Sequence, residues 1–214
     1  MKDLSLHLLD VLENSVKAGA RHVRVTFGWA GTVLRIVLED DGPGLPPEIA
    51  VSPTDPFRTT RTERKVGLGL ALLEQAAADG GGDLKVFSTP GRGVRLEATF
   101  DLSTVDAKPV GDLCESLTSA ACAWPETALS VSTEDGNMIL DMEEVSAVLD
   151  GMDPGHPAAR RFVSDSLSEG LAELHGWVER VFHLGPGLPG QSSVDREGDS
   201  RSAAEETAEA IHKP

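Results

Sequence analysis

The 214-residue sequence has no tyrosine, and aromatic residues make up only 4% of it. Proteins that bind RNA or single-stranded DNA commonly stack bases on aromatic side chains, so this shortage argues against such a function. Cations are also few, because 19 Lys and Arg stand against 35 Asp and Glu, for a formal net charge of −16. Such an excess of acidic groups disfavours nonspecific DNA binding and docking on an anionic membrane. Nucleic acid and membrane are therefore not expected as partners.

Cysteines and long hydrophobic runs are scarce as well. Cys114 and Cys122 are the only cysteines, and two of them cannot form a disulfide framework or a metal site with paired spacing. No run approaches the roughly 20 apolar residues that a membrane helix requires. Asp3 and Asp10 interrupt what would be the apolar part of a signal peptide. We therefore expect reduced thiols and a cytoplasmic location.

Acidic residues are concentrated in the second half of the chain. Residues 1–105 hold 12 Lys and Arg against 14 Asp and Glu, whereas residues 106–214 hold 7 against 21. This shift predicts one domain over 1–105, a small acidic α/β accessory domain over 106–183, and a tail over 184–214. The tail is rich in Gly, Pro, Ser and charged residues without apolar periodicity, so we expect it to be disordered.

Hydrophobic periodicity predicts an α+β fold for the first domain. Residues 3–18 repeat with the helical period, with Leu4, Leu8 and Ser15 on the apolar half. A polar strip opposite that half consists of Asp3, His7, Asp10, Asn14 and Lys17. Residues 67–78 predict a second helix, and alternating patterns over 23–29 with 32–39, and over 83–88 with 94–101, predict four strands. The expected arrangement is a sheet with two helices on one face.

The second domain is predicted to mix helices with one hairpin. Helical patterns occupy residues 112–123, 141–149 and 158–181, and strands are expected over 128–133 and 137–140.

Asp10 and Asn14 are four residues apart, so they project from one face of the first helix. An Asn amide oxygen suits Mg²⁺, and a carboxylate one turn earlier can orient or deprotonate a nucleophile. Taken alone, the pair equally fits an ordinary solvated helix face.

Asp40-x-Gly42-x-Gly44 directly follows a predicted strand. Glycines let the backbone approach a flat ligand closely, and a carboxylate can accept a hydrogen bond from an exocyclic amine. An ordinary Gly/Pro turn is the alternative.

Gly67-Leu68-Gly69-Leu70 opens the second helix, where free N–H groups and the helix dipole favour an anion. A run of cations precedes it, consisting of Arg58, Arg61, Arg64 and Lys65. Together these features suit a phosphate group, with a solvated basic loop as the alternative. The chain has neither a P-loop nor a Rossmann motif.

These three motifs, followed by Gly91-Arg92-Gly93, resemble in order the N, G1, G2 and G3 boxes of the GHKL superfamily. That superfamily comprises gyrase B subunits, heat-shock chaperone ATPases, sensor histidine kinases and mismatch-repair ATPases. The first box, over residues 9–20, is especially similar to the mismatch-repair form. The resemblance covers about residues 1–105 and implies a Bergerat-type two-layer α/β sandwich that binds ATP with Mg²⁺.

The resemblance also implies roles for individual residues. Asn14 would ligate Mg²⁺, Asp40 would bind the adenine amino group, and Asp10 would be the catalytic base. The adenine pocket would be shaped by Gly42 and Gly44, and the phosphates would be held by Lys65, Gly67, Leu68 and Gly69. Residues 46–66 would form a lid with Phe57 as its hydrophobic anchor, although Phe57 equally fits a plain packing residue.

Two positions depart from the family pattern. Hydrolysing members usually have Glu where this chain has Asp10, and the shorter side chain reaches about one methylene less far, which disfavours efficient activation of a nucleophile. Family members usually have a Thr near the adenine after the last box, and this chain has Val94 there. The hydroxyl contact of that Thr is therefore expected to be lost.

A carboxylate at position 10 favours ATP hydrolysis or Ser/Thr phosphorylation, because water and hydroxyl nucleophiles must lose a proton. None of the six His is followed by Glu or Asp, as a phosphoacceptor His would be, and we expect no dimerisation helices before the ATP domain. We expect a signalling or regulatory protein that acts on a protein partner as a protein kinase, Ser/Thr- or histidine-kinase-like, or as a slow ATPase. The alternatives are a nucleotide-gated interaction module without significant catalysis, and a degenerate domain without nucleotide. A homodimer is also left open, and the acidic second half is expected to prefer a basic partner.

Overall fold

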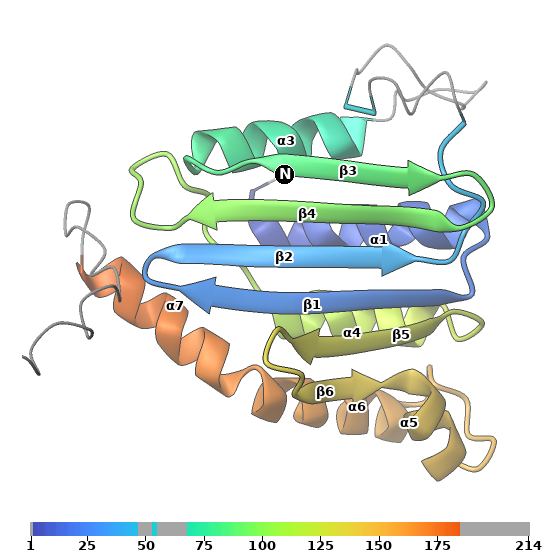
Figure 1. The fold of residues 1–214 in the computed structure, drawn as a ribbon. Helices are drawn as coiled ribbons and strands as arrows, with labels where there is room; N and C mark the ends of the chain where they lie inside the picture. Colours follow the sequence, from blue (N-terminus) through green and yellow to red (C-terminus); the bar gives the residue numbers. More distant parts are fainter. Residues whose placement is uncertain (1, 47–52, 55–67, 185–214) are drawn as a thin grey trace, which may run out of the picture.

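The computed structural model describes residues 2–46, 53–54 and 68–184, and the structural statements below refer to these residues. Its helices are α1 (Leu4–Ala18), α3 (Leu68–Asp79), α4 (Leu113–Ala123), α5 (Met142–Val148), α6 (Pro157–Gly170) and α7 (Ala172–Leu184) (Figure 1). Its strands are β1 (His22–Ala30), β2 (Val33–Asp40), β3 (Leu84–Thr89), β4 (Gly93–Asp101), β5 (Ala128–Thr133) and β6 (Met138–Asp141). The fold is α+β, as the sequence predicts.

All six strands belong to one sheet, in the order β3-β4-β2-β1-β5-β6 (Figure 1). Neighbouring strands are antiparallel except for β1 and β5, which run parallel in a register from His22↔Ala128 to Phe27↔Thr133. The boundary expected near residue 105 therefore falls within one continuous sheet. Strands from the second half of the sequence extend the sheet that the first half begins.

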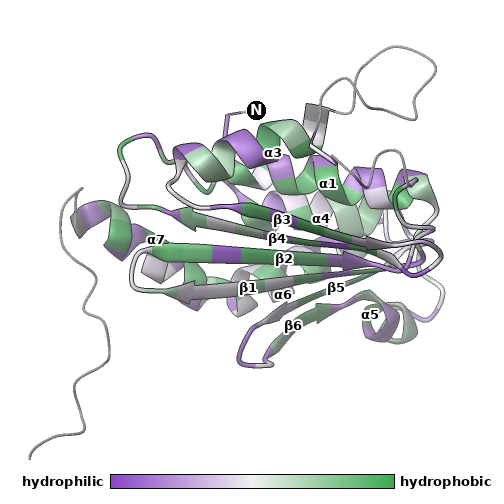
Figure 2. Cartoon of the chain, turned by 45° about the horizontal axis from the view of Figure 1, so that its top comes forward, coloured by the Kyte–Doolittle hydropathy of each residue, from purple (hydrophilic) through white to green (hydrophobic). Residues whose placement is uncertain are grey.

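Helices α1, α3 and α4 cover one face of the sheet, and α6 lies beyond α4 against β6 (Figures 1 and 2). The inward-facing residues of β1 and β2 alternate along each strand and are buried beneath these helices, among them Val23, Val25, Phe27, Leu34, Ile36 and Leu38. None of the described helices has the length and hydrophobicity needed to cross a membrane.

Helix α1 begins and ends where its sequence predicts. Asp3 caps it by accepting a hydrogen bond from the Leu6 backbone N–H at 3.1 Å, and Gly19 ends it in the left-handed conformation at φ 93°. His7 departs from the expected polar strip, because it is 1% exposed. The reason is that α3 and α4 flank α1 and cover more of its surface than one apolar face requires.

The single helix expected over residues 158–181 is divided into α6 and α7. Helix α6 ends at Gly170, which lies so close to β6 that an added Cβ would overlap the Ile139 side chain. Trp177 of α7 then donates from Nε1 to the Gly31 carbonyl oxygen at 3.1 Å. The expected disordered tail, from residue 185 onward, lies outside the described residues.

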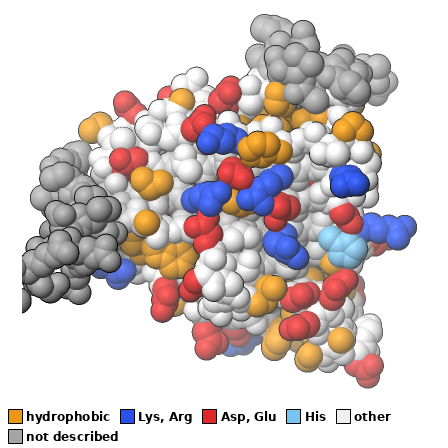
Figure 3. All heavy atoms as spheres, viewed as in Figure 1, with side chains coloured by type: hydrophobic (Ala, Val, Ile, Leu, Met, Phe, Trp, Pro, Cys, Tyr) orange, Lys and Arg blue, Asp and Glu red, His pale blue; other side chains and the backbone are white. Residues whose placement is uncertain are grey.

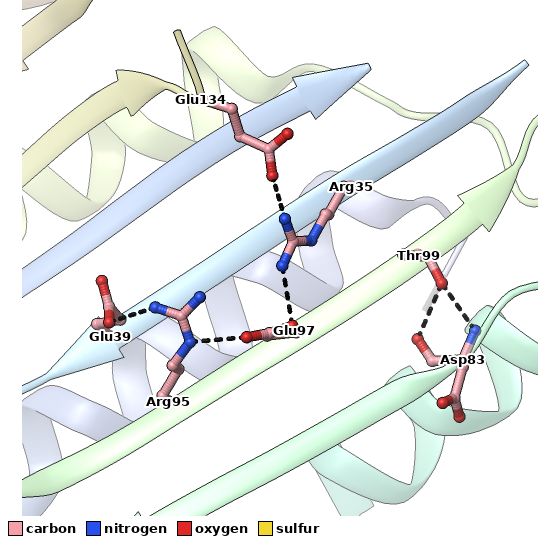
Figure 4. A network of polar contacts seen from close by, with 7 residues as sticks. All are labelled: Arg35, Glu39, Asp83, Arg95, Glu97, Thr99 and Glu134. Atoms are coloured by element: carbon pink, nitrogen blue, oxygen red, sulfur yellow. Dashed lines mark hydrogen bonds and ion pairs between the residues drawn. The ribbon is translucent and has the colours of Figure 1, made fainter. Parts of the chain in front are cut away.

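Over β4, β2 and β1, the opposite face of the sheet shows no helix among the described residues and carries side chains of both charges (Figures 1 and 3). Arg95 binds Glu39 at 2.5 Å and Glu97 at 2.7 Å, and Arg35 binds Glu97 at 2.9 Å and Glu134 at 2.5 Å (Figure 4). The hydrogen bonds from Arg95 and Arg35 lower the pKa of Glu97. The face is thus an ion-pair network rather than an apolar surface.

Candidate functional site

The carboxylate of Asp40, at the end of β2, receives hydrogen bonds from three separate parts of the chain. Its Oδ1 accepts from the backbone N–H groups of Gly42 at 2.9 Å and Val94 at 3.2 Å, and its Oδ2 accepts from the Ser15 hydroxyl at 2.8 Å. Val94 has no side-chain hydroxyl, but its main chain contributes to the site. Because a carboxylate has about four acceptor positions, Asp40 can accept about one more hydrogen bond.

The loop after β2, residues 41–46, is fastened to the β3–β4 turn. The Leu45 N–H donates to Ser88 Oγ at 2.7 Å, and the Gly91 N–H donates to the Pro43 carbonyl oxygen at 2.8 Å. Gly44 has φ +77°, and a Cβ there would lie 2.7 Å from the Thr89 carbonyl oxygen. Glycine is therefore required at this position both by its backbone conformation and by the close approach of the turn.

Gly93 makes a second close approach, because a Cβ there would overlap the Asp40 carbonyl oxygen. Gly42 is buried, and a Cβ on it would meet Asp40 Oδ1 at 3.0 Å. The second and fourth motifs of the sequence therefore meet around the Asp40 carboxylate.

Asp10 and Asn14 are half-buried neighbours on α1, and Asn14 Nδ2 donates to Asp10 Oδ2 over a long 3.4 Å. Leu68 is the first residue of α3. At the next residue, Gly69, an added Cβ would overlap the Asp10 carboxylate and lie 3.3 Å from Asn14 Nδ2. The first and third motifs of the sequence therefore meet through this glycine.

Several residues expected at the site lie outside the described residues. They are Phe57, Lys65 and Gly67, together with Arg58, Arg61, Arg64 and most of the expected lid over residues 46–66.

The hydroxyl of Ser15 is a site contact that the sequence did not single out. Its place on the apolar half of the helix suggested packing, and it is indeed only 6% exposed. A hydroxyl on the apolar half of a helix indicates a buried hydrogen bond, because a buried hydroxyl needs a partner. The sequence alone does not identify Asp40 as that partner.

No cluster of three or more His, Cys, Asp and Glu suited to a metal ion occurs in the part of the chain that the structure describes. A metal at this site would depend on few protein ligands. Mg²⁺ is compatible with such a site, because it commonly retains several waters and binds through one or two protein groups and substrate phosphates.

A second polar cluster lies beside Asp40, around a hollow of about 370 Å³ lined in part by Arg24, Ser130 and Asp141. There His22 Nδ1 pairs with Asp41 at 2.6 Å, and His22 Nε2 pairs with Glu143 of α5 at 3.4 Å. The hydrogen bond to Asp41 is the main cause that raises the pKa of His22. Partial burial acts to raise the pKa of Asp41, but hydrogen bonds from the His22 backbone and ring outweigh it and lower that pKa.

Residues 2–104 match the family described as histidine kinase-, DNA gyrase B-, and HSP90-like ATPases. The DNA mismatch repair protein MutL of Thermus thermophilus is 30% identical over 204 residues, which cover 80% of this chain and 36% of MutL. The nitrogen regulation protein NtrY of Azorhizobium caulinodans is 31% identical over 116 residues, which cover 50% of this chain and 15% of NtrY. The chain thus spans well under two thirds of either relative.

Among solved structures, the chain matches a mycobacterial sensor histidine kinase, MprB. It is 28% identical over a region that covers 44% of this chain and 66% of the MprB chain, with a TM-score of 0.36.

Proposed function

The chain carries a GHKL ATPase-like domain over residues 2–104, and from this premise we propose that it binds ATP together with Mg²⁺. We further propose that it acts on a protein partner as a protein kinase or a slow ATPase. The observation that carries the proposal is the Asp40 carboxylate, which is fixed by three hydrogen bonds and can accept about one more.

In this proposal Asp40 accepts the 6-amino group of adenine. A carboxylate only accepts hydrogen bonds, so it favours a base that offers a donor at that position. Guanine presents a keto oxygen there, which would face Asp40 with like partial charge. The glycine positions around Asp40 support the fit, since Gly42 brings its backbone N–H within 2.9 Å of Asp40 Oδ1.

The phosphate end is proposed to lie where Asn14 meets the start of α3. The Asn14 amide oxygen would ligate Mg²⁺, and the backbone near Gly69 would face the phosphates, as the first turn of a helix favours. The absence of a side chain at Gly69 supports this reading, because the backbone of α3 then approaches Asp10 and Asn14 closely. When bound, Mg²⁺ neutralises charge on the phosphate oxygens.

Asp10 is the proposed base. It lies one turn before Asn14, and the contact between the two side chains would orient both toward one ligand. Its carboxylate would take a proton from an attacking water or hydroxyl group, and its short side chain favours slow turnover. The identity of the nucleophile, water or a partner's hydroxyl, then separates the ATPase from the kinase.

The second candidate is a nucleotide-gated interaction module. The observation that favours it is the bridge from Asp41, next to Asp40, through His22 to Glu143 on α5. This bridge joins the proposed nucleotide loop to the acidic second half, which would bind a basic protein partner through its charge of −14 over residues 106–214. Incubation with γ-labelled ATP and a partner separates the two candidates. Labelled phosphate transferred to the partner or released into solution supports an enzyme. Partner binding that depends on nucleotide, with no transfer and no release of phosphate, supports an interaction module.

The ATP proposal is tested by calorimetric titration of Mg-ATP into the intact chain and into Asn14→Ala. We expect the affinity of the variant to fall by at least about tenfold, because a metal ligand is lost. Without Mg²⁺ the two proteins should bind ATP equally.

Asn137→Ala is the matched control, because it makes the same change at an exposed turn between β5 and β6 and should bind as the intact chain does. Equal Mg-ATP affinity for the intact chain and Asn14→Ala would contradict the metal assignment. No binding by the intact chain would overturn the ATP proposal itself.

A further inference from the structure

We propose that Ser15 is a positioning residue, which orients the Asp40 carboxylate toward the nucleotide base and so sets the preference for a 6-amino purine. The inference rests on the proposed ATP binding and deepens it by naming what holds the base-reading group in place.

The hydroxyl of Ser15 has its hydrogen-bond partner outside its own helix. Helical Ser and Thr often bond back to the carbonyl oxygen one turn earlier. Ser15 instead donates over 2.8 Å to Asp40 Oδ2, 25 residues further along the chain. The side chain is 6% exposed, so water competes little for this bond.

The three hydrogen bonds on Asp40 are distributed unevenly between its two oxygens. Oδ1 accepts from the backbone N–H groups of Gly42 and Val94, whereas Oδ2 has Ser15 as its one protein donor among the described residues. Oδ2 is therefore the oxygen with more capacity to accept an amine. With contacts at Oδ1 alone, rotation of the carboxylate about the Cβ–Cγ bond would be restrained at one oxygen only. The bond from Ser15 prevents this rotation and fixes the direction in which Oδ2 accepts.

Ser15 also connects the two ends of the proposed site. It follows Asn14 directly on α1, and Asn14 contacts Asp10 and lies near Gly69. One turn of α1 thus contacts the group proposed to read the base and carries the group proposed to hold the metal. A shift of α1 would therefore move Ser15 and Asn14 together.

The test measures the affinities of Ser15→Ala for Mg-ATP and for Mg-ITP, which has a keto oxygen in place of the 6-amino group. Without the bond from Ser15, Asp40 no longer holds the orientation that receives the 6-amino group, and the loss of that hydrogen bond from ATP to a charged group is expected to weaken ATP binding by about tenfold or more. ITP has no 6-amino group to donate to Asp40, so its affinity should change less than about twofold. The preference for ATP over ITP should therefore fall by about tenfold.

Ser5→Ala is the matched control. Ser5 lies on the same helix, is 2% exposed and donates to Asp3 at 2.8 Å, so the same change occurs away from Asp40. It should leave both affinities unchanged. Ser15→Cys keeps the volume but is a weak donor, so it provides the same measurement if Ser15→Ala does not fold.

Equal weakening of ATP and ITP, or an unchanged affinity for ATP, would overturn the role of Ser15. These outcomes differ from failure of the proposed function, in which the unsubstituted chain binds neither nucleotide.

Discussion

His7 lies on α1, three residues before Asp10, with 1% of its surface exposed and no hydrogen bond from the described residues to either ring nitrogen. Burial is the main cause that lowers its pKa to about 4, and the positive charges of the N-terminus and Lys108 add to the effect. The fold thus accommodates the neutral imidazole and disfavours the charged one. A buried polar group without a hydrogen-bond partner costs free energy. The imidazole of His7 is therefore not expected to stabilise the fold at neutral pH.

Replacing His7 with Leu is expected to change how stability depends on pH. Between about pH 6.5 and pH 4, an unfolded chain binds a proton at His7 that the folded chain does not. The free energy of unfolding should therefore fall as the pH drops through this window, by up to about 3 kcal/mol from this residue. Urea unfolding at several pH values should give a flatter profile for His7→Leu. Parallel profiles for the two proteins would contradict the assignment.

At the scale of secondary-structure elements, β2 and β4 are linked by charge across the sheet face that the helices leave uncovered. Glu97 on β4 accepts from Arg95 on its own strand and from Arg35 on β2, and it is the least exposed member of the network, with 20% of its side chain exposed (Figure 4). Isolated surface pairs contribute little, but a carboxylate shared by two guanidinium groups is held more firmly.

Glu97→Gln is expected to lower the free energy of unfolding by about 1 kcal/mol at low salt and by less at 1 M salt, because salt screens the pairs. The pKa of Glu97 is lowered in the fold, so its contribution is present above the unfolded pKa near 4.5 and is lost as the pH falls below it. Chemical denaturation at two salt concentrations measures the effect. Glu74→Gln, at an exposed position of α3 without a described ion pair, is the control and should show neither change. A salt-independent loss at Glu97 would indicate altered packing instead.

At the scale of the whole molecule, the parallel pairing of β1 with β5 makes the two halves of the sequence one sheet. Helix α4, from the second half, also connects the two halves, because it packs beside α1 on the covered face. Leu117 of α4 is fully buried and belongs to the same continuous core as Phe27 and Leu38. A shared core of this kind predicts that the described halves unfold together.

Leu117→Ala should therefore destabilise the first half as well as the second. A cavity of this type costs about 2–5 kcal/mol. Amide hydrogen exchange, measured by mass spectrometry, should show the same loss of protection in β2 and in β5, since core strands exchange through global unfolding. Leu72→Ala, at a position of α3 that is 39% exposed, should have little effect on either strand. A loss confined to residues 113–184 would show that the halves unfold separately.

Local patterns predicted most elements of this fold because their causes are local. Helix α1 has its cap at Asp3 and its stop at Gly19, and the alternation along β1 and β2 sets which side chains enter the core. Helical periodicity over 158–181 does not predict the division between α6 and α7, and it does not predict that Gly170 lies against Ile139, a contact across 31 positions of sequence. His7 was misplaced because helix periodicity assumes one covered face, whereas α1 is flanked on two sides.

The sequence by itself determined the four motifs, their order and the kinds of ligand that their residue types suit, because these follow from side-chain chemistry and spacing. The tertiary structure alone decided which groups meet: Ser15 and the Val94 backbone at Asp40, Gly69 against Asp10, and β5 beside β1. Hydrogen bonds and strand pairing between distant segments depend on how the chain folds back on itself, and composition and periodicity do not encode those distances.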